Sequence, residues 1–496
     1  MKCFGKPLNI LSFFFSPIFL FPSRIVFRYT SLHSMPYLTE VEKVDPELAE
    51  IIHREMAREY RGLELIASEN FTSKAVLECL GSALTNKYAE GEVGSRYYGG
   101  TEFVDGVEKL AKSRALEAFK LNPSEWGVNV QPYSGSPANL AVYVGLLQPH
   151  DRIMGLDLPS GGHLTHGFYT PKKRISASSL FYESLPYHVN EDGVIDYDEL
   201  ERNATIYRPK MIILGASAYT RDYDYERVRA LCDKLECLLF MDMAHTAGLI
   251  AGEVLKSPFQ YADVVSTTTH KSLRGPRAGM IYFRKTDRNG NATDFEGRIN
   301  QAVFPGLQGG PHMNNIAAIA TQMKDVCSPA WKEYAKQVQV NAQALGKIMI
   351  SKGHTLISGG TDNHILLWNT RVLNLTGSKV EKILDAVNIS TNKNTIPGDK
   401  SAITPGGIRL GLCALTSRGF VEKDMEAVAT FLERAIQIAL EIQGETASMK
   451  LAEFIATFPS NDKLAALRKE VEEFSAKFDM PSFNGSDIKY KNGIPH

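Results

Sequence analysis

The chain has 496 residues, a formal net charge of −1 at pH 7 and 22% charged residues, so its charge points to neither a nucleic acid nor a membrane surface as a partner. Its hydrophobic content of 44% is ordinary for a globular protein, and its length allows two domains. Six cysteines without CxxC spacing indicate reduced thiols in an intracellular protein. Cys232 and Cys237 suit a helix end and the following strand better than a zinc site, and no metal is predicted.

The first 35 residues differ from the rest, because they contain no acidic residue and include four basic residues and a Phe-rich run at 10–21. That run is too short, and too broken by Pro17 and Pro22, to span a bilayer. Three interpretations remain open: an organelle presequence, a segment upstream of a start at Met35, and, third, a secretory signal without a clear cleavage site. We expect a mitochondrial location for a presequence and a cytoplasmic location for a start at Met35.

Residues 36–62 are predicted to form an N-terminal helical arm. Leu48, Ile51 and Met56 belong to a set of apolar residues at helical spacing, and Asp45-Pro46 is typical of an N-cap and first turn.

Residues 63–313 are predicted to form a large domain. Short apolar runs at 127–130, 152–155, 211–215, 238–241, 262–265 and 280–283 have the length of buried strands. Helical stretches, among them 113–119 and 137–147, alternate with these runs. The alternation predicts an α/β fold with a mostly parallel sheet that helices cover on both faces.

Residues 314–480 are predicted to form a smaller C-terminal α+β domain, because the pattern changes after Pro311. It contains a long helical region at 314–349, strands near 355–357 and 365–368, and helices at 378–387 and 422–443. Residues 481–496 are rich in Gly, Ser, Asn and Pro and are predicted to be a flexible tail.

Lys271 lies between a run of hydroxyl side chains (266–269) and a Gly/Pro loop, and Asp242 ends the apolar run 238–241. Ligands of open α/β sheets bind at the carboxyl ends of strands, which is where Asp242 is expected. Pyridoxal phosphate requires a lysine that forms a Schiff base and a buried carboxylate that faces its protonated ring nitrogen. The sequence therefore predicts a pyridoxal phosphate site.

Two segments are candidates for binding the cofactor phosphate. Ser134-Gly135-Ser136-Pro137 follows a predicted strand and begins a predicted helix, where backbone N–H groups and small hydroxyls suit an anion. The same residues are also common in ordinary turns. The segment 306–311 contains Gly309 and Gly310, which allow close approach of the backbone to a phosphate. On local grounds alone, a flexible turn between domains is the better interpretation of this second segment.

The segment Gly161–Gly167 contains two histidines. His-x-x-His without a nearby Glu or Cys is a poor zinc signature, and the glycines instead favour close approach to a flat ring with one imidazole stacked on it. Without further context, a histidine satisfied by hydrogen bonds in a turn is the commoner interpretation.

Three more positions offer polar groups. Ser217 follows the run 211–215 at the same predicted sheet edge. Arg409 lies among small residues, where a bidentate guanidinium suits an amino-acid carboxylate, although a single arginine is more often a surface residue. Glu90 lies in a segment rich in Tyr and Gly (87–100) that is suited to cover a pocket and supply an acid/base group.

With these motifs assembled, the chain resembles the serine hydroxymethyltransferase family over about residues 55–454. The segments that carry the resemblance are 65–70, 88–100, 131–139, 161–167, 242–245, 267–274, 358–364 and 414–418. The resemblance implies a pyridoxal phosphate enzyme of fold type I, similar to aspartate aminotransferase. It also implies transfer of the serine hydroxymethyl carbon to tetrahydrofolate as co-substrate, and a homodimer or homotetramer with shared active sites.

The resemblance implies a role for each matching position. Lys271 forms the bond to the cofactor, Asp242 pairs with its ring nitrogen, and Glu90 is the acid/base group. The implied catalytic residues are Lys271, Glu90, Asp242, His163 and His245. The implied cofactor-binding residues are Ser134, Gly135, Ser136, His163, Ser217, Asp242, His245 and Lys271, joined by Gly309 and Gly310 of a neighbouring subunit. The implied substrate-binding residues are Ser68, Tyr88, Glu90, Tyr98, Asn394 and Arg409.

The chain departs from the family pattern at two places. It has Glu92, Val93 and Ser95 where the family usually has Tyr, Pro and Lys, which we expect to add flexibility and negative charge beside Glu90 and to alter folate binding. Cys413 replaces a proline and is either a sensitive thiol or, more simply, a tolerated turn substitution. The alternatives to hydroxymethyl transfer are a folate-independent aldolase, such as a threonine aldolase, and a cofactor-binding regulatory scaffold.

Overall fold

The structure is a computed structural model that describes residues 40–399, 404–444 and 449–489, so the segment 1–35 lies outside the described residues. The chain divides into two compact units, 1–52 and 53–496. The described part of the first unit contains α1 (Val41–Val44) and the start of α2 (Pro46–Arg61), which confirms the predicted helix with proline in its first turn. Among the described residues, no helix combines the length and apolar character needed to span a membrane.

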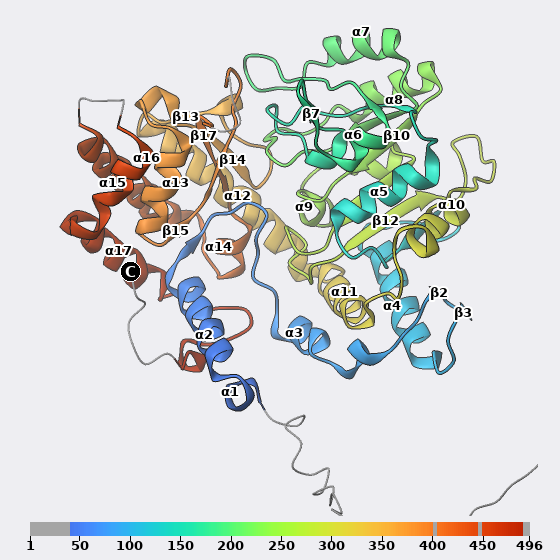
Figure 1. The fold of residues 1–496 in the computed structure, drawn as a ribbon, viewed down its shortest axis with the longest axis horizontal. Helices are drawn as coiled ribbons and strands as arrows, with labels where there is room; N and C mark the ends of the chain where they lie inside the picture. The colour runs from blue at the N-terminus through green and yellow to red at the C-terminus, as the bar shows by residue number, and fades with distance from the viewer. Residues whose placement is uncertain (1–39, 400–403, 445–448, 490–496) are drawn as a thin grey trace, which may run out of the picture. The chain divides into compact units, whose positions relative to one another are not determined.

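A seven-stranded sheet is the centre of the large part of the second unit (Figure 1). Its strands, in spatial order, are β4 (Trp126–Asn129), β12 (Gly279–Arg284), β11 (Val264–Thr268), β10 (Leu238–Asp242), β9 (Met211–Leu214), β5 (Arg152–Met154) and β8 (Glu183–Ser184). Only β12 pairs antiparallel with its neighbours. The predicted mostly parallel α/β sheet is therefore confirmed.

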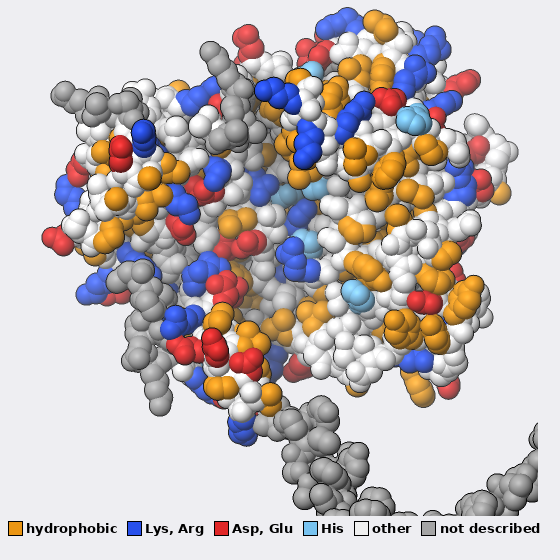
Figure 2. Space-filling view, viewed as in Figure 1, with side chains coloured by type: hydrophobic (Ala, Val, Ile, Leu, Met, Phe, Trp, Pro, Cys, Tyr) orange, Lys and Arg blue, Asp and Glu red, His pale blue; other side chains and the backbone are white. Residues whose placement is uncertain are grey.

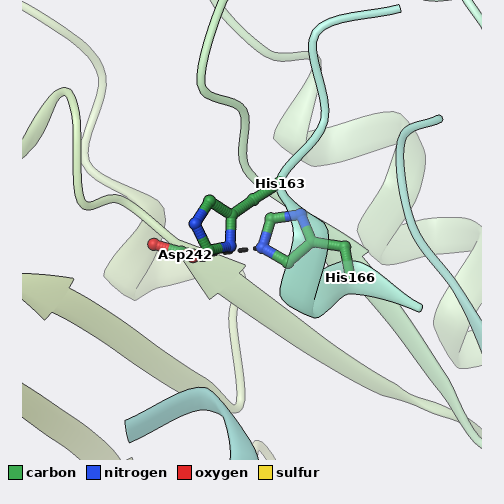
Figure 3. A group of neighbouring side chains, drawn as sticks. All are labelled: His163, His166 and Asp242. Atoms are coloured by element: carbon green, nitrogen blue, oxygen red, sulfur yellow. Dashed lines mark hydrogen bonds and ion pairs between the residues drawn. The ribbon is translucent and has the colours of Figure 1, made fainter. Parts of the chain in front are cut away.

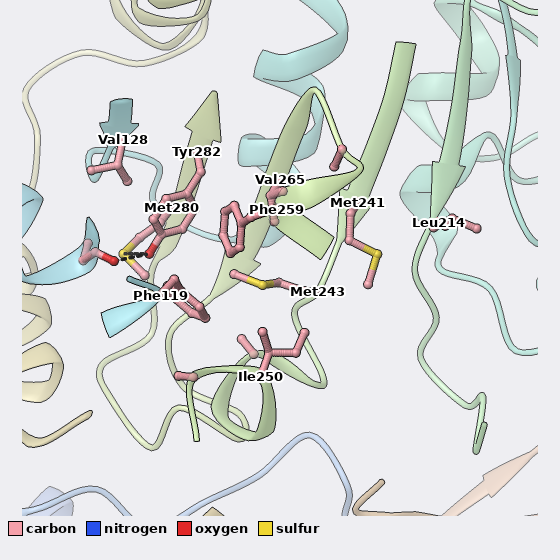
Figure 4. Packing of buried hydrophobic residues seen from close by; sticks show 14 of the residues in the cluster. Phe119, Val128, Leu214, Met241, Met243, Ile250, Phe259, Val265, Met280 and Tyr282 are labelled. Atoms are coloured by element: carbon pink, nitrogen blue, oxygen red, sulfur yellow. Dashed lines mark hydrogen bonds between the residues drawn. The ribbon is translucent and has the colours of Figure 1, made fainter. Parts of the chain in front are cut away.

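Alternate residues of these strands pack on opposite faces of the sheet, as the period of a strand requires. On β10, Phe240 packs with α5 (Gly135–Leu146) and α10 (Phe295–Gln301) on one face. Leu239 and Met241 pack on the other face, in a cluster that also contains residues of α4 (Glu102–Ala118), α8 (Tyr225–Leu235), α9 (Ala247–Ala251) and α11 (Met313–Val326). Figure 4 shows part of this second cluster, in which Met241, Phe259, Val265 and Met280 are labelled.

A separate hydrophobic core lies in the C-terminal part of this unit. Its antiparallel sheet has the order β13 (Thr355–Leu356), β14 (Ile365–Asn369), β17 (Gly407–Gly411) and β16 (Asn392–Asn394). The core also includes residues of α12 (Pro329–Ser351), α13 (Gly377–Ala386), α15 (Met425–Gln443) and α17 (Asp462–Ser475). The α+β character predicted for this region is present.

The chain enters the C-terminal core once before it builds the large sheet. β1 (Leu63–Glu64) pairs parallel with β15 (Ile389–Ser390), and Leu63 and Leu65 are fully buried in the C-terminal core. The segment after β1 is thereby held beside β17, because Gly411 donates its backbone N–H to the carbonyl of Leu65 at 2.8 Å. The predicted domain boundaries at 63, 314 and 481 stay predictions.

Two elements differ in extent from the prediction. The helical region 314–349 is broken into α11 and α12, because Pro329 has no N–H to continue the first helix and instead begins the second. Strand β11 runs on to Thr268, so residues 266–268 of the hydroxyl run belong to a strand, where β-branched threonines are favoured. The remaining elements are α3 (Lys74–Leu80), β2 (Gly91–Glu92), β3 (Ser95–Arg96), β6 (Tyr169–Thr170), β7 (Lys173–Arg174), α6 (Ala177–Phe181), α7 (Tyr197–Tyr207), α14 (Cys413–Ser417) and α16 (Leu451–Ala456).

Arg418, directly after α14, joins three segments of the C-terminal part. Its guanidinium donates to the backbone carbonyls of Tyr60 and Gly62, at the end of α2, and to the carbonyl and hydroxyl of Ser475. Only 4% of the residue is exposed, and burial lowers its pKa to about 10. Carbonyl oxygens and one hydroxyl, rather than a carboxylate, therefore accept the hydrogen bonds of this buried cation.

Replacing Arg418 by Ala is expected to lower the free energy of unfolding by about 3 kcal/mol or more, because several buried carbonyls lose their donor. Urea denaturation followed by circular dichroism measures this change. The matched control is Arg434→Ala, which removes a part-exposed pair with Glu470 and is expected to cost less than about 1 kcal/mol. An equal effect of the two substitutions contradicts this role of Arg418.

Candidate active site

A cavity of about 380 Å³ opens beside the carboxyl ends of β10 and β11. Segments far apart in the sequence line it, and among their residues are Ser134, His163, Asp242, Lys271 and Arg409. In Figure 2, Lys or Arg side chains and histidines gather in a hollow of the surface. The structure brings these predicted residues together with Ser68, Gly135, Ser136, Ser217 and His245.

Asp242 ends β10 and has 10% of its side chain exposed. Its Oδ2 accepts hydrogen bonds from Asn139 Nδ2 at 2.8 Å and from His166 Nε2 at 3.0 Å, and its Oδ1 accepts from the backbone N–H of Ala244 at 3.1 Å. Burial by itself raises a carboxyl pKa, but the hydrogen bond from His166 and the nearby positive charge of Lys271 hold the pKa of Asp242 well below its usual range. Asp242 is therefore a buried carboxylate that stays charged at neutral pH.

One buried amide, that of Asn139, connects the carboxylate to its surroundings. Asn139 lies one turn inside α5; its Oδ1 accepts from Ser266 Oγ at 2.6 Å, and its Nδ2 donates to Thr165 Oγ1 at 2.9 Å as well as to Asp242. The Thr165 hydroxyl lies 2.7 Å from His163 Nδ1, which also accepts the backbone N–H of Thr165. The network therefore fixes the positions of Asp242 and His163 relative to each other.

His163 is held as a neutral ring. Burial lowers its pKa to about 4, and the hydrogen bonds from Thr165 mark Nδ1 as an acceptor, so the ring proton belongs on the other nitrogen. A neutral, flat imidazole that faces the cavity is suited to stack on an aromatic ligand.

His163, His166 and Asp242 lie close enough together to raise the question of a metal ion (Figure 3). Their potential ligand atoms fall within 4.8 Å of one another. Hydrogen bonds account for this arrangement, because His166 Nε2 donates to Asp242 and His163 Nδ1 accepts from Thr165. The expectation of no metal stays a prediction.

Lys271 follows β11, and its backbone carbonyl accepts Asn70 Nδ2 at 3.0 Å. Asn70 in turn bonds Tyr334 of α12 and Ser417 of α14, at 2.9 and 2.6 Å. Burial and the positive charges of Arg409 and Arg277 lower the pKa of Lys271 to about 8, against the attraction of Asp242. At neutral pH, Lys271 therefore has a larger fraction of nucleophilic neutral amine than an ordinary lysine.

The start of α5 faces the same cavity and has the features of an anion site. Backbone N–H groups of the first helical turn have no partners within a helix, and the helix dipole favours negative charge there. A Cβ on Gly135 would lie 2.7 Å from Thr268 Cγ2, so only glycine leaves this space open. Among the described residues, Thr268 Oγ1 and the Nδ1 atoms of His245 and His270 are buried without a hydrogen-bond partner. Such orphaned polar atoms fit a polar ligand in this cavity.

Arg409, on β17 of the C-terminal sheet, also lines the cavity. Its Nη1 donates to the carbonyl of Ser217 at 2.7 Å, its Nε to Asn392 Oδ1 at 3.1 Å, and its Nη2 lies 3.4 Å from Ser68 Oγ. Burial lowers its pKa to about 10, which leaves it charged at neutral pH. No carboxylate pairs with it among the described residues' ion pairs, so a ligand carboxylate can take that place.

Other predicted residues lie outside this cavity. Tyr88, Gly309 and Gly310 line a separate cavity of about 560 Å³. Glu90 lies beside Gly309, and the ring of Tyr98 is 5.2 Å from that of Tyr88. Asn394 lines a third cavity of about 340 Å³, which shares His163 and Ser217 with the first. One copy of the chain thus brings Asn394 next to the main cavity but keeps the group around Glu90 apart from it.

Comparisons with known proteins agree with this geometry. The sequence profile of the serine hydroxymethyltransferase family matches residues 41–432. Serine hydroxymethyltransferase 4 of Arabidopsis thaliana is 56% identical over 92% of this chain and 98% of the relative. Serine hydroxymethyltransferase 3, chloroplastic, of the same plant is 53% identical over 88% of this chain and 84% of the relative. The cytosolic serine hydroxymethyltransferase of Oryctolagus cuniculus is 51% identical over 92% of this chain and 97% of the relative.

The chain belongs to the serine hydroxymethyltransferase family. The resemblance read from the sequence is therefore confirmed, and with it the fold type I architecture of the family, which the mostly parallel sheet of the structure matches.

Sequence reasoning assigned no role to Asn139, His166 or Asn70. Asn139 carried a usable signal, because it lies four residues after Gly135 and so on the same helix face. His166 was considered only as half of a metal pair. Asn70 lies in the segment 65–70 that carries the family resemblance, but its contact with Lys271 spans 201 residues of sequence and leaves no local pattern.

The two departures from the family pattern have definite surroundings. Glu92 pairs with Lys112 at 2.9 Å, so its added negative charge is matched by a cation. Cys413 is 1% exposed among Leu249 and Val338, and burial raises the pKa of its thiol to about 12. A thiol that stays protonated and inaccessible is not a sensitive thiol, which supports the tolerated substitution.

The lowered pKa of Lys271 has a consequence for its reactivity. In the cofactor-free protein, we expect Lys271 to react with a small amine reagent that does not itself titrate in this range, such as acetic anhydride, at a rate that rises up to about pH 8 and levels off above pH 9. The reaction rate of the exposed lysines of the protein is expected to rise up to about pH 10.4. Peptide mass spectrometry of timed reactions measures both. A Lys271 rate that still rises above pH 10 contradicts the lowered pKa.

Proposed function

We propose that this chain transfers the hydroxymethyl carbon of serine to tetrahydrofolate, reversibly, with glycine and 5,10-methylenetetrahydrofolate as products. The observation that carries the proposal is one cavity in which Lys271, a charged buried Asp242 and Arg409 converge. Family membership supports the same reaction, since relatives named serine hydroxymethyltransferase are 51–56% identical over most of the chain.

Pyridoxal phosphate fits the residues present. Lys271 would supply the amine for its aldehyde, Asp242 would pair with its ring nitrogen, and the start of α5 with Ser134, Gly135 and Ser136 would hold its phosphate. The orphaned Thr268 Oγ1 and His245 Nδ1 are polar atoms that a bound cofactor can satisfy. When bound, pyridoxal phosphate accepts the electron pair that remains on Cα when the Cα–Cβ bond of serine breaks.

The protein's own groups prepare this chemistry. Asp242 stays ionised and so keeps a proton on a nitrogen that faces it, which an amide at this position does not do. His163, neutral and fixed by Thr165, offers its ring face to a planar ligand. Ser217 and His245 line the same cavity and orient polar substituents of the ligand. Arg409 holds the amino-acid carboxylate, with Ser68 beside it.

Folate chemistry requires groups that one copy of the chain keeps apart from Lys271. We assign the acid/base role between amino acid and folate to Glu90, and places beside it to Tyr88 and Tyr98. With Gly309 and Gly310, which line a cavity together with Tyr88, these residues serve the active site of a second copy. This part of the proposal therefore includes a homodimer or homotetramer with shared sites. Asn394, in the cavity that adjoins His163, contacts the pterin.

We propose an intracellular location. Relatives of the chain include one named chloroplastic and one named cytosolic, so the family works in more than one compartment. Residues 1–35 decide between a mitochondrial and a cytoplasmic location in this proposal.

The proposed function is tested by incubating the purified protein and pyridoxal phosphate with serine, with and without tetrahydrofolate. We expect glycine formation that depends on tetrahydrofolate, because the hydroxymethyl carbon needs its acceptor. Amino-acid analysis by mass spectrometry measures it. Cleavage of threonine without any effect of tetrahydrofolate on serine favours the aldolase, and cofactor binding without turnover favours the scaffold.

Arg409→Lys is expected to raise the KM for serine about tenfold or more, because an ammonium cannot bind a carboxylate in the bidentate manner of a guanidinium. The KM for tetrahydrofolate is expected to change far less. Initial rates at varied serine and at varied folate measure the two constants. Arg371→Lys, on a part-exposed arginine of the same C-terminal sheet region, is the matched control. An unchanged KM for serine removes Arg409 from the substrate site.

A further inference from the structure

The short hairpin that follows Glu90 is held by one arginine. We propose that Arg96 is a positioning residue for Glu90, which it acts on by binding the backbone on both sides of that residue. This inference rests on the proposed function, in which Glu90 is the acid/base group of the folate reaction.

Three successive backbone carbonyls around Glu90 accept hydrogen bonds. Arg96 Nη1 donates to the carbonyl of Ala89 at 2.8 Å and to that of Gly91 at 2.6 Å. The carbonyl of Glu90 itself accepts the backbone N–H of Tyr97 at 3.0 Å. Three consecutive carbonyls are thus fixed, which sets both peptide planes at the Cα of Glu90 and leaves only its side-chain torsions variable.

Arg96 is in turn held by the folded core. Its Nε and Nη2 donate to Asp105 at 2.8 Å and to Glu108 at 2.7 Å, both on α4, and only 2% of its side chain is exposed. Glu108 is completely buried. Helix α4 packs against the large sheet through Ala111 and Ala115. Charge-assisted hydrogen bonds therefore link the segment 89–91 to a rigid helix rather than to another loop.

Glu92, which stands where the family usually has Tyr, adds a second link between the hairpin and α4. Lys112 Nζ lies 2.9 Å from Glu92 and 2.9 Å from Glu108, so one ammonium joins the hairpin to the carboxylate that holds Arg96. Gln131 Nε2 also donates to the carbonyl of Gly91, at 3.1 Å, and to Glu108. The added flexibility that we expected from the departure at 92–95 is thus opposed by ties at both ends of the hairpin.

Position matters for Glu90 because proton transfer requires hydrogen-bond reach to the reacting group. A displacement of about 1 Å in such a group can lower a rate by about 100-fold. Lysine at position 96 keeps the charge but cannot bind two carbonyls and two carboxylates at once, because it lacks the planar fork of arginine.

The experiment compares Arg96→Lys with the matched control Arg284→Lys, each made in the wild-type protein and in a Glu90→Gln background. Arg284, the last residue of β12, also binds backbone carbonyls, those of Phe259 and Ala262, and shares no partner with Arg96. Three quantities are measured: folate-dependent serine conversion, folate-independent cleavage of threonine, and hydrogen exchange of the backbone amides of 89–97 by mass spectrometry.

We expect Arg96→Lys to lower the folate-dependent kcat by about 10- to 100-fold, with the KM for serine and the folate-independent rate changed less than about twofold. In the Glu90→Gln background the same substitution is expected to have no further effect on the folate-dependent rate, because the residue through which Arg96 acts is already gone. Exchange at 89–97 is expected to rise in Arg96→Lys and to stay unchanged in Arg284→Lys. Glu92→Gln is expected to act in the same direction but more weakly, because its ion pair is part-exposed.

Equal losses of both activities in Arg96→Lys, or the same loss with and without Glu90, show that Arg96 supports the fold generally and overturn the inference. Unchanged exchange at 89–97 overturns it as well. If the wild-type protein shows no folate-dependent conversion, the proposed function is wrong, and the exchange data alone decide whether Arg96 fixes this segment.

Discussion

The active site depends on one carboxylate that remains charged where little water reaches it. Asp242 ends a fully paired central strand, and an unpaired charge at such a place costs far more free energy than a folded chain can spare. Asn139, His166 and the N–H of Ala244 replace the water that the carboxylate loses. Because Asn139 also bonds Thr165, the same interaction orients His163. The same hydrogen bonds of Asn139 therefore keep Asp242 charged and hold the ring of His163 in place.

The path of the chain brings the second half of the site to this carboxylate. β1 pairs with β15 before the large sheet begins, so Ser68 and Asn70 leave the C-terminal core at the point where Arg409 and Ser417 lie. Asn70 then bonds the backbone of Lys271. One short segment thus connects the residue proposed to bind the substrate carboxylate with the lysine proposed to bind the cofactor. Asn70 therefore links the C-terminal core to the backbone of Lys271 through a few hydrogen bonds.

The residues around Glu90 follow a different rule. Residues 89–91 are tightly bound within their own copy, through Arg96 and α4, and none of them lines the cavity that holds Lys271 and Asp242. Such a rigid group fits the proposed site shared between two copies. The rigid hairpin also explains how the departure at Glu92 is accommodated, since Lys112 takes up its charge.

The sequence by itself determined the family, the mostly parallel sheet and most of the residues that face the main cavity. It could do so because strand periodicity, the position of Asp242 at a strand end and the glycines near Ser134 are local properties of the chain. Only the tertiary structure decided which of these residues share a cavity and which groups hold them. Asn139 reaches Asp242 across 103 residues, and Arg409 reaches Ser217 across 192. Such contacts depend on how strands and helices pack, and packing between distant segments leaves no local pattern in the sequence. The helix break at Pro329 follows from a single residue and is a local property of the sequence. The hydrogen bonds of Arg96 to the carbonyls of Ala89 and Gly91 lie within one short hairpin, but the sequence does not show them because α4 holds the guanidinium in place.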